Sequence, residues 1–194
     1  MHRQSLLTLL AQYQPTNPEE LLFKTRIQRF MSDHPDCFER TLAIGHITAS
    51  CWLLSADASH ALLTHHAKLN AWFQLGGHCD GNPDVLAVAL REAQEESGMN
   101  AIEPILHGIF DLDIHTIPAN SREQAHDHYD IRFLLKVTSD EQPRPSHESK
   151  ALRWISKNKA DLPTHTPSIL RMFGKWAQSS TASSCDALQR CYTR

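Results

Sequence analysis

The segment from residue 76 to residue 99 constrains this chain more than any other part of it. It reads GGHCDGNPDVLAVALREAQEESGM and joins a glycine-rich turn to a helix-forming run that ends at Gly98. Glu92, Glu95 and Glu96 are spaced i, i+3 and i+4, so on a helix their carboxylates share one narrow patch. The apolar face expected beside that patch consists of Leu86, Ala89, Leu90 and Ala93, with Val85 and Val88 near its edges.

Three like charges at this spacing repel one another and weaken the helix unless a cation lies among them. Mg²⁺ in proteins is commonly held by a few carboxylates together with water and substrate phosphate. The alternative is a solvated acidic face, on which Arg91 pairs with Glu95 four residues later in a surface contact of small energy. The carboxylate spacing by itself leaves both interpretations open.

The wider segment resembles the Nudix box, which is a glycine, five residues, Glu, seven residues, then R-E-apolar-x-E-E-x-G-apolar. Gly77 takes the first position, and residues 91–99 (REAQEESGM) take the second half in register. Pro83 stands where the box has its first Glu. Residues 62–73 and 126–133, and Glu148 followed by Trp154, resemble a bacterial Nudix subgroup, so the resemblance covers about residues 42–160.

The resemblance implies an α/β fold, a Nudix-type α/β/α sandwich with a mixed sheet. It implies a pyrophosphohydrolase that uses Mg²⁺ or Mn²⁺ to hydrolyse a phosphoanhydride bond in a small diphosphate compound, such as a nucleoside diphosphate linked to another group. The metal ligands that it implies are Glu92, Glu95, Glu96, the carbonyl of Gly76, and Glu148 from a later loop. Glu92 would be a ligand or the base that accepts a proton from water, and Arg91 would orient these carboxylates.

The chemistry agrees with this assignment, because a bound divalent ion activates water and neutralises phosphate charge. The chain has no Gly-Lys loop of the Walker type, so it is not a P-loop enzyme. Two alternatives stay open. One is a non-catalytic Nudix-fold module that binds nucleotide or protein, for which Pro83 is the one hint. The other is an enzyme similar to isopentenyl diphosphate isomerase.

Several polar residues in the later strand region are open to more than one interpretation. His126 and His128 point the same way on a strand, and imidazole suits zinc, with His115 on a neighbouring strand as a third ligand. Pocket lining or surface exposure is the commoner role of such histidines. The subgroup resemblance favours contact between His126, His128, Tyr129 or Arg132 and the substrate, although Arg132 could equally pair with a carboxylate.

The first forty residues are expected to be a helical extension. Asn17, Pro18 and two glutamates form a helix start, and Phe23, Ile27, Phe30 and Met31 repeat as one apolar stripe that must pack on the main domain or on a partner. Residues 46–55, 61–66, 102–117, 129–137 and 151–155 are expected as strands, and residues 84–97 and 168–178 as helices. The domains expected are a helical extension (1–40), a Nudix domain (41–178) and a mobile tail (179–194).

Composition limits the partners and the setting. The net charge of −3 gives no basic field for a nucleic-acid polymer or an anionic membrane. No run approaches the roughly 18 apolar residues of a membrane span. The five scattered cysteines indicate no disulfide framework, and a reducing cytoplasm is the simplest setting. The resemblance is compatible with a homodimer, and the sequence leaves the oligomeric state open.

Overall fold

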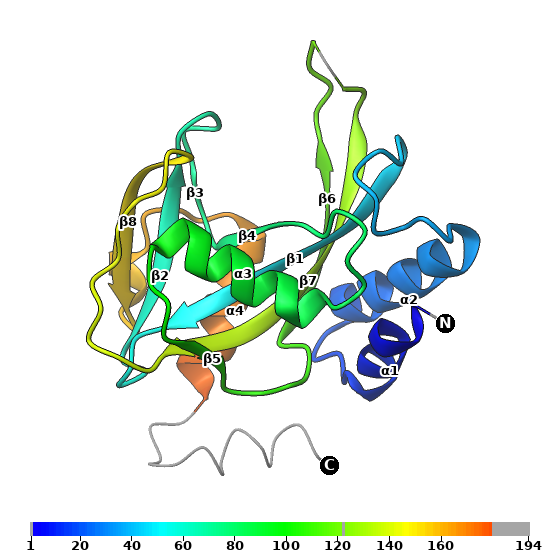
Figure 1. The fold of residues 1–194 in the computed structure, drawn as a ribbon. Helices are drawn as coiled ribbons and strands as arrows, with labels where there is room; N and C mark the ends of the chain where they lie inside the picture. The colour runs from blue at the N-terminus through cyan, green and yellow to red at the C-terminus, as the bar shows by residue number, and fades with distance from the viewer. Residues whose placement is uncertain (1, 122, 180–194) are drawn as a thin grey trace. The chain divides into compact units, whose positions relative to one another are not determined.

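The structure is a computed structural model that describes residues 2–121 and 123–179 (Figure 1). The chain forms two compact units. One contains Met1–Ser50, Gly76–Ala89 and His107–Phe133, and the other contains Cys51–Leu75, Leu90–Leu106 and Leu134–Arg194, of which the structure describes residues up to 179. Three elements, β1 (Gly45–Leu54), α3 (Val85–Ser97) and β7 (His126–Val137), continue from one unit into the other.

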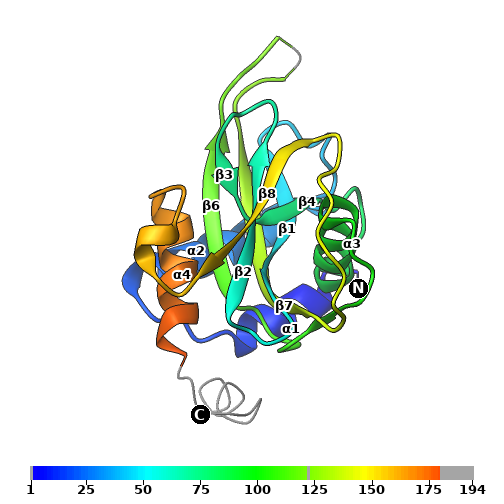
Figure 2. The ribbon, with the colours of Figure 1, turned by 90° about the vertical axis from the view of Figure 1, so that its left-hand side faces the viewer.

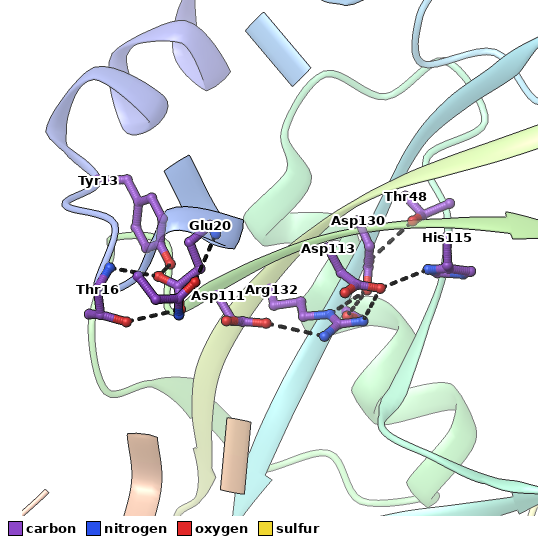
Figure 3. A network of polar contacts seen from close by, with 11 residues as sticks. Tyr13, Thr16, Glu20, Thr48, Asp111, Asp113, His115, Asp130 and Arg132 are labelled. Atoms are coloured by element: carbon purple, nitrogen blue, oxygen red, sulfur yellow. Dashed lines mark hydrogen bonds and ion pairs between the residues drawn. The ribbon is translucent and has the colours of Figure 1, made fainter. Parts of the chain in front are cut away.

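The N-terminal helices belong to the first unit and are α1 (Gln4–Gln12) and α2 (Pro18–Asp33). The helix start expected at Asn17 is confirmed, because the Asn17 side chain accepts a hydrogen bond from the backbone N–H of Glu20 at 3.0 Å. The Glu20 carboxylate is fully buried and accepts a hydrogen bond from the Tyr13 hydroxyl at 2.7 Å (Figure 3). Thr16 and Asn17 donate to it as well, so this buried charge is held within the helical extension.

The apolar stripe of α2 is covered by strands of the same unit, as the sequence required. All four of its members are buried, namely Phe23, Ile27, Phe30 and Met31. The Phe30 ring stacks on the Tyr129 ring of β7 with their centroids 4.0 Å apart. At the edge of the contact, Arg26 pairs with Asp127 at 3.2 Å. The extension is therefore packed on the strands that carry part of the functional region.

This contact leads to a stability prediction. Phe30→Leu removes the stacking on Tyr129 but keeps an apolar side chain, so we expect the free energy of unfolding to fall by about 1 kcal/mol. Leu22→Ala on the same helix is the control, because Leu22 is 55% exposed and its truncation should change stability by less than about 0.5 kcal/mol. Equal denaturation midpoints for the two variants would show that the Phe30 contact contributes little.

The first unit contains strands that lie side by side in the order β4, β1, β7, β6. β6 (Asp111–Ile117) pairs antiparallel with β7, from Asp111 opposite Arg132 to Ile117 opposite His126. β4 (Leu75–His78) pairs with β1. Neighbouring β1 and β7 run in the same direction in Figure 1, so parallel and antiparallel pairs occur in one sheet.

The second unit adds β2 (His60–His66), β3 (Trp72–Phe73), β5 (Ile102–Pro104) and β8 (Ser149–Ser156), and the sheet order is β3-β2-β1-β7-β5 with β8 on β2. β8 lies antiparallel along β2 (Figure 2). A short 3-10 helix (Lys159–Asp161) precedes α4 (Pro167–Gln178). The buried side of α4 includes Trp176, whose ring centroid lies 6.0 Å from that of Trp52 on β1. The α/β class with a mixed sheet is confirmed.

Two expectations about the strands were wrong. Residues 102–117 form two strands, β5 and β6, which are separated by residues 105–110. The glycine-rich turn expected from residue 76 instead begins with the last three residues of the short strand β4, and β3 lies just before β4. None of the helices in the described ranges has the length and apolar character needed to cross a membrane. The mobile tail expected for residues 179–194 lies, apart from Ser179, outside the described residues, and the boundary at residue 40 stays a prediction.

Candidate metal-binding site

The helix that carries the three glutamates, α3, begins one residue later than expected. The Asp84 side chain accepts a hydrogen bond from the backbone N–H of Ala87 at 3.0 Å, and its carbonyl accepts one from Val88 at 3.0 Å. Asp84, expected as the first helical residue, is thus the capping residue. Asn82 accepts a hydrogen bond from the Asp84 N–H at 3.0 Å, so Asn82 and Pro83 form the turn before the cap.

The end of α3 explains the last glycine of the box. Gly98 has a φ of +69°, and its N–H donates to the Gln94 carbonyl at 2.9 Å. A left-handed residue after a helix is usually glycine, because it has no Cβ to strain. A Cβ at Gly98 would also lie 3.1 Å from the Arg144 Cβ, so the chain passes closely here.

Burial along α3 differs between the three glutamates. The buried apolar residues of the helix are Val85, Val88, Ala89 and Ala93. Leu86 and Leu90, expected at the centre of the apolar face, are only partly buried, so that face is rotated toward Val85 and Val88. Glu96 is 9% exposed and the Glu92 side chain 15% exposed, whereas Glu95 is exposed. Two of the three carboxylates therefore lie on the inner side of the helix and not on a solvated face.

The ion pair of Arg91 also differs from a solvated acidic face. The Arg91 guanidinium lies 2.8 Å from the Glu92 carboxylate, not on Glu95 one turn later. Because the Glu92 side chain is mostly buried, this pair fixes its orientation more firmly than an exposed pair would.

The two other ligands implied by the resemblance lie on different elements. Gly76 on β4 has a φ of +157°, and a Cβ there would lie 2.3 Å from the Ser50 Cβ of β1. Only glycine fits this position, which fixes the backbone of the box start against β1. Glu148 precedes β8 in a turn, its carbonyl accepts the Ala67 N–H at 2.8 Å, and its side chain is 52% exposed.

Arg132 on β7 is the centre of a buried ion network (Figure 3). Its guanidinium donates to Asp130 at 2.7 Å, to Asp111 at 3.1 Å and to Asp113 at 3.1 Å. Burial alone would lower the pKa of Arg132, but these three carboxylates outweigh burial and raise the pKa above its ordinary value. Of the two roles left open for Arg132, carboxylate pairing is the one present in the structure, in which Arg132 is 1% exposed.

The network continues to β1 and β6. The Asp130 carboxylate accepts hydrogen bonds from the Ser50 hydroxyl at 2.7 Å and the Thr48 hydroxyl at 3.1 Å. Asp113 lies 3.0 Å from His115 Nδ1. Ser50 is also the residue that Gly76 approaches so closely, so the network supports the strand on which the box begins.

Five histidines gather beside this network on four adjacent strands of the first unit. They are His46 on β1, His78 on β4, His115 on β6, and His126 and His128 on β7. The His128 ring is central, because its centroid lies 4.8–5.4 Å from those of the other four. The sequence grouped His115, His126 and His128 but gave no reason to include His46 and His78, each of which is a single histidine near the end of a strand.

The inner histidines of this cluster are neutral at pH 7. Burial, and then the neighbouring histidines, lower the pKa of His46 to about 4 and that of His128 to about 2. Burial followed by the Arg40 charge also lowers the pKa of His78. These rings can donate or accept hydrogen bonds, or bind a metal, but they do not act as cations toward a phosphate.

Arg40 connects the box loop to the histidine cluster. Its guanidinium pairs with Asp80 at 2.5 Å and lies 2.9 Å from His78 Nδ1. Asp80 has a left-handed φ of +49°, and Gly81 follows with a φ of +81°. The Gly81 N–H donates a hydrogen bond to the Phe38 carbonyl at 3.0 Å. The loop is therefore held to the segment that precedes β1.

The described chain thus combines a mixed sheet with a box helix on which two of three glutamates face inward. The NUDIX domain model matches residues 45–176, and the chain belongs to the Nudix hydrolase family. The departure at Pro83 does not remove it from the family, because the match spans the whole sheet region.

Comparison with solved structures supports the fold. The C. elegans Ap4A hydrolase complex aligns with a TM-score of 0.50 and 16% identity, covering 68% of this chain and 94% of that one. The E. coli dihydroneopterin triphosphate pyrophosphohydrolase aligns with a TM-score of 0.52 and 13% identity, covering 69% of this chain and 96% of that one. A Nudix-family hydrolase from Clostridium perfringens is 28% identical, with a TM-score of 0.48. The alignment covers 68% of this chain and 95% of that one. No curated protein matches the chain.

Proposed function

We propose that this Nudix hydrolase uses Mg²⁺ or Mn²⁺ to hydrolyse a phosphoanhydride bond in a small diphosphate compound. The observation that carries the proposal is the inward position of Glu92 and Glu96 on the box helix, at two of the box's glutamate positions. Partial burial penalises the charge of a carboxylate, and the Arg91 guanidinium, 2.8 Å from Glu92, offsets that penalty for one of the two. Oxygen ligands of this kind fit Mg²⁺ and Mn²⁺.

The roles proposed for the residues follow the resemblance together with the geometry. Glu92, Glu95 and Glu96 would hold the metal, with the Gly76 carbonyl and Glu148 as further ligands. When bound, the ion would lower the pKa of a water molecule and offset phosphate charge. Glu92 would bind the ion or accept the proton of the attacking water, and Arg91 keeps the Glu92 carboxylate in one orientation.

The substrate class proposed is a nucleotide-like diphosphate. The Ap4A hydrolase and the dihydroneopterin triphosphate pyrophosphohydrolase named above act on compounds of that kind, and both share the fold. His126, His128 and Tyr129 are proposed to contact the substrate through hydrogen bonds. We do not extend this role to Arg132, whose donors are engaged by carboxylates.

A panel of diphosphate compounds tests the function. The full chain would be incubated with dinucleoside polyphosphates, nucleoside diphosphate sugars and nucleoside triphosphates in Mg²⁺ or Mn²⁺, and both products of each compound would be identified. We expect cleavage between two phosphorus atoms. Binding without cleavage across the panel would favour the non-catalytic alternative, and isotope exchange into isopentenyl diphosphate without phosphate release would favour the isomerase alternative.

The missing box glutamate leads to a prediction about metal requirement. Asp80 pairs with Arg40 and Asp84 caps α3, so both nearby carboxylates are already engaged. We therefore expect Pro83→Glu to lower the Mg²⁺ concentration for half-maximal rate by about tenfold, the scale of a group that supports metal ligands. Pro83→Gln is the matched control without charge. An identical Mg²⁺ dependence for both variants and the wild type would show that the position does not act on the metal.

The setting and assembly proposed are a reducing cytoplasm and a homodimer. Cys37, Cys51 and Cys79 are buried as thiols, which supports a reducing compartment. Burial raises the pKa of the Cys37 thiol to about 11, so it is also unreactive. Light scattering at several protein concentrations would decide between monomer and dimer.

A further inference from the structure

We propose that His46, His78 and His128 form a second metal site, selective for zinc-like transition metals and separate from the glutamates of α3. One ring nitrogen from each of the three lies within 4.8 Å of the others. Nitrogen ligands around tetrahedral zinc, with bonds of about 2.0–2.1 Å, would be about 3.3 Å apart. Metal binding would therefore draw these nitrogens closer together, mainly by movement of His46 and His78. The inference does not rest on the proposed hydrolase function, and it assigns His128 to the metal and not directly to the substrate.

The strongest support is the lack of protein partners for the inner nitrogens. Both ring nitrogens of His46 and the Nε2 of His128 are buried and have no partner with good hydrogen-bond geometry within residues 2–121 and 123–179, and the nearby Leu42 backbone only partly offsets the burial of His46. His46 is 2% exposed, so solvent does not satisfy its ring from outside. Buried polar atoms in proteins are nearly always satisfied, which indicates that a ligand outside the chain completes this site.

The flanking histidines show the contrast. His115 is held through Nδ1 by Asp113 at 3.0 Å, and His126 is held through Nδ1 by the Gln124 carbonyl at 2.9 Å. Their rings pack against His128 at 5.4 and 5.2 Å and limit its rotation. Two rings of the cluster are thus fixed by the protein, whereas His46 and His128 present unsatisfied nitrogens toward His78.

The donor set selects the metal. Neutral imidazoles bind Zn²⁺, Ni²⁺ or Cu²⁺, whereas Mg²⁺ prefers oxygen ligands. Three protein nitrogens leave a fourth position open for water or a substrate oxygen, as in catalytic zinc sites. Arg40 opposes the metal, because its guanidinium lies 2.9 Å from His78 Nδ1. Binding through His78 Nε2 requires a proton on Nδ1, so Arg40 must then pair with Asp80 alone.

The test is metal binding by the full chain, measured without turnover. Metal-free protein would be titrated with Zn²⁺ against a chromophoric chelator, and with Co²⁺ to record the visible absorption of the bound ion. Removal of a group behind the ligands typically weakens metal binding about 10–100-fold, so loss of a direct ligand in His46→Gln or His128→Gln should weaken Zn²⁺ binding by more than about 100-fold. Circular dichroism would check that each variant folds. If either buried variant fails to fold, the partly exposed His78→Gln replaces it.

Two controls separate this site from others. His147→Gln removes a 92% exposed histidine and should bind one Zn²⁺ as the wild type does. Glu96→Gln should also keep Zn²⁺ binding, and excess Mg²⁺ should not displace the ion. Wild-type protein that binds less than one Zn²⁺, or cluster variants that bind it as tightly as the wild type, would overturn the proposal. Loss of Zn²⁺ binding in Glu96→Gln alone would also overturn it, because the ion would then occupy the carboxylate site.

Discussion

Replacing Glu96 by Gln is expected to lower kcat by more than about 100-fold at saturating Mg²⁺, because a direct metal ligand is lost while the side chain keeps its shape. The variant should fold as the wild type does. Without metal its helix should even be slightly more stable, since one charge is removed from three glutamates that repel one another. Steady-state rates and thermal unfolding, each with and without Mg²⁺, measure both effects.

A surface glutamate gives the matched control for this substitution. Glu103 on β5 is 53% exposed and pairs with Lys136 at 3.2 Å, so Glu103→Gln changes the same chemical group away from the box. Its kcat should equal that of the wild type, and its stability should change by less than about 1 kcal/mol. Wild-type turnover by Glu96→Gln would remove Glu96 from the metal site.

Replacing Arg132 by Met is expected to destabilise the protein by about 3–5 kcal/mol, because three buried carboxylates would lose their shared cation. For a chain of this size that corresponds to a fall in Tm of roughly 10 °C. Asp111, Asp113 and Asp130 are each 6% exposed or less, so water cannot replace the guanidinium without local opening. Calorimetry or thermal circular dichroism would measure the shift.

Arg29→Met is the control, since Arg29 is 84% exposed and its contact with Asp33 is a surface pair expected to contribute less than about 1 kcal/mol. A second outcome tests the role of Arg132 directly. If Arg132→Met were as stable as the wild type but had a raised KM, the guanidinium would contact substrate and the structural assignment would be wrong.

The sequence was sufficient for features that depend on local spacing. Helix geometry predicts that the glutamates at i, i+3 and i+4 share one face and that the helix ends at Gly98. The register of the box resembles the Nudix family, and the structure has the fold of that family. The stripe through Phe23 and Phe30 was predictable for the same reason. Even here the cap fell on Asp84 and the buried face was rotated, because cap choice and helix orientation depend on neighbours that local spacing does not reveal.

Features that depend on strand pairing were not predictable. His46 and His78 are 32 residues apart in the chain and meet because β1 pairs with β4. Asp111 and Asp113 reach Arg132 only through the register of β6 on β7. A single sequence specifies neither pairing. Arg132 therefore kept two interpretations until the ladder showed which charges it faces, and two of the five clustered histidines went unnoticed.

Metal-dependent hydrolysis at the glutamates of α3 is tested most directly by measuring how cleavage depends on metal in water enriched in ¹⁸O. With the panel compound that is cleaved fastest, we expect no turnover in the presence of a chelator, a rate that rises to saturation with Mg²⁺ or Mn²⁺, and ¹⁸O in one phosphate-containing product. Glu96→Gln should remove the metal-dependent rate under the same conditions. Turnover that persists after chelation, or that is equal in Glu96→Gln, would contradict a metal-dependent hydrolase centred on the glutamates of α3.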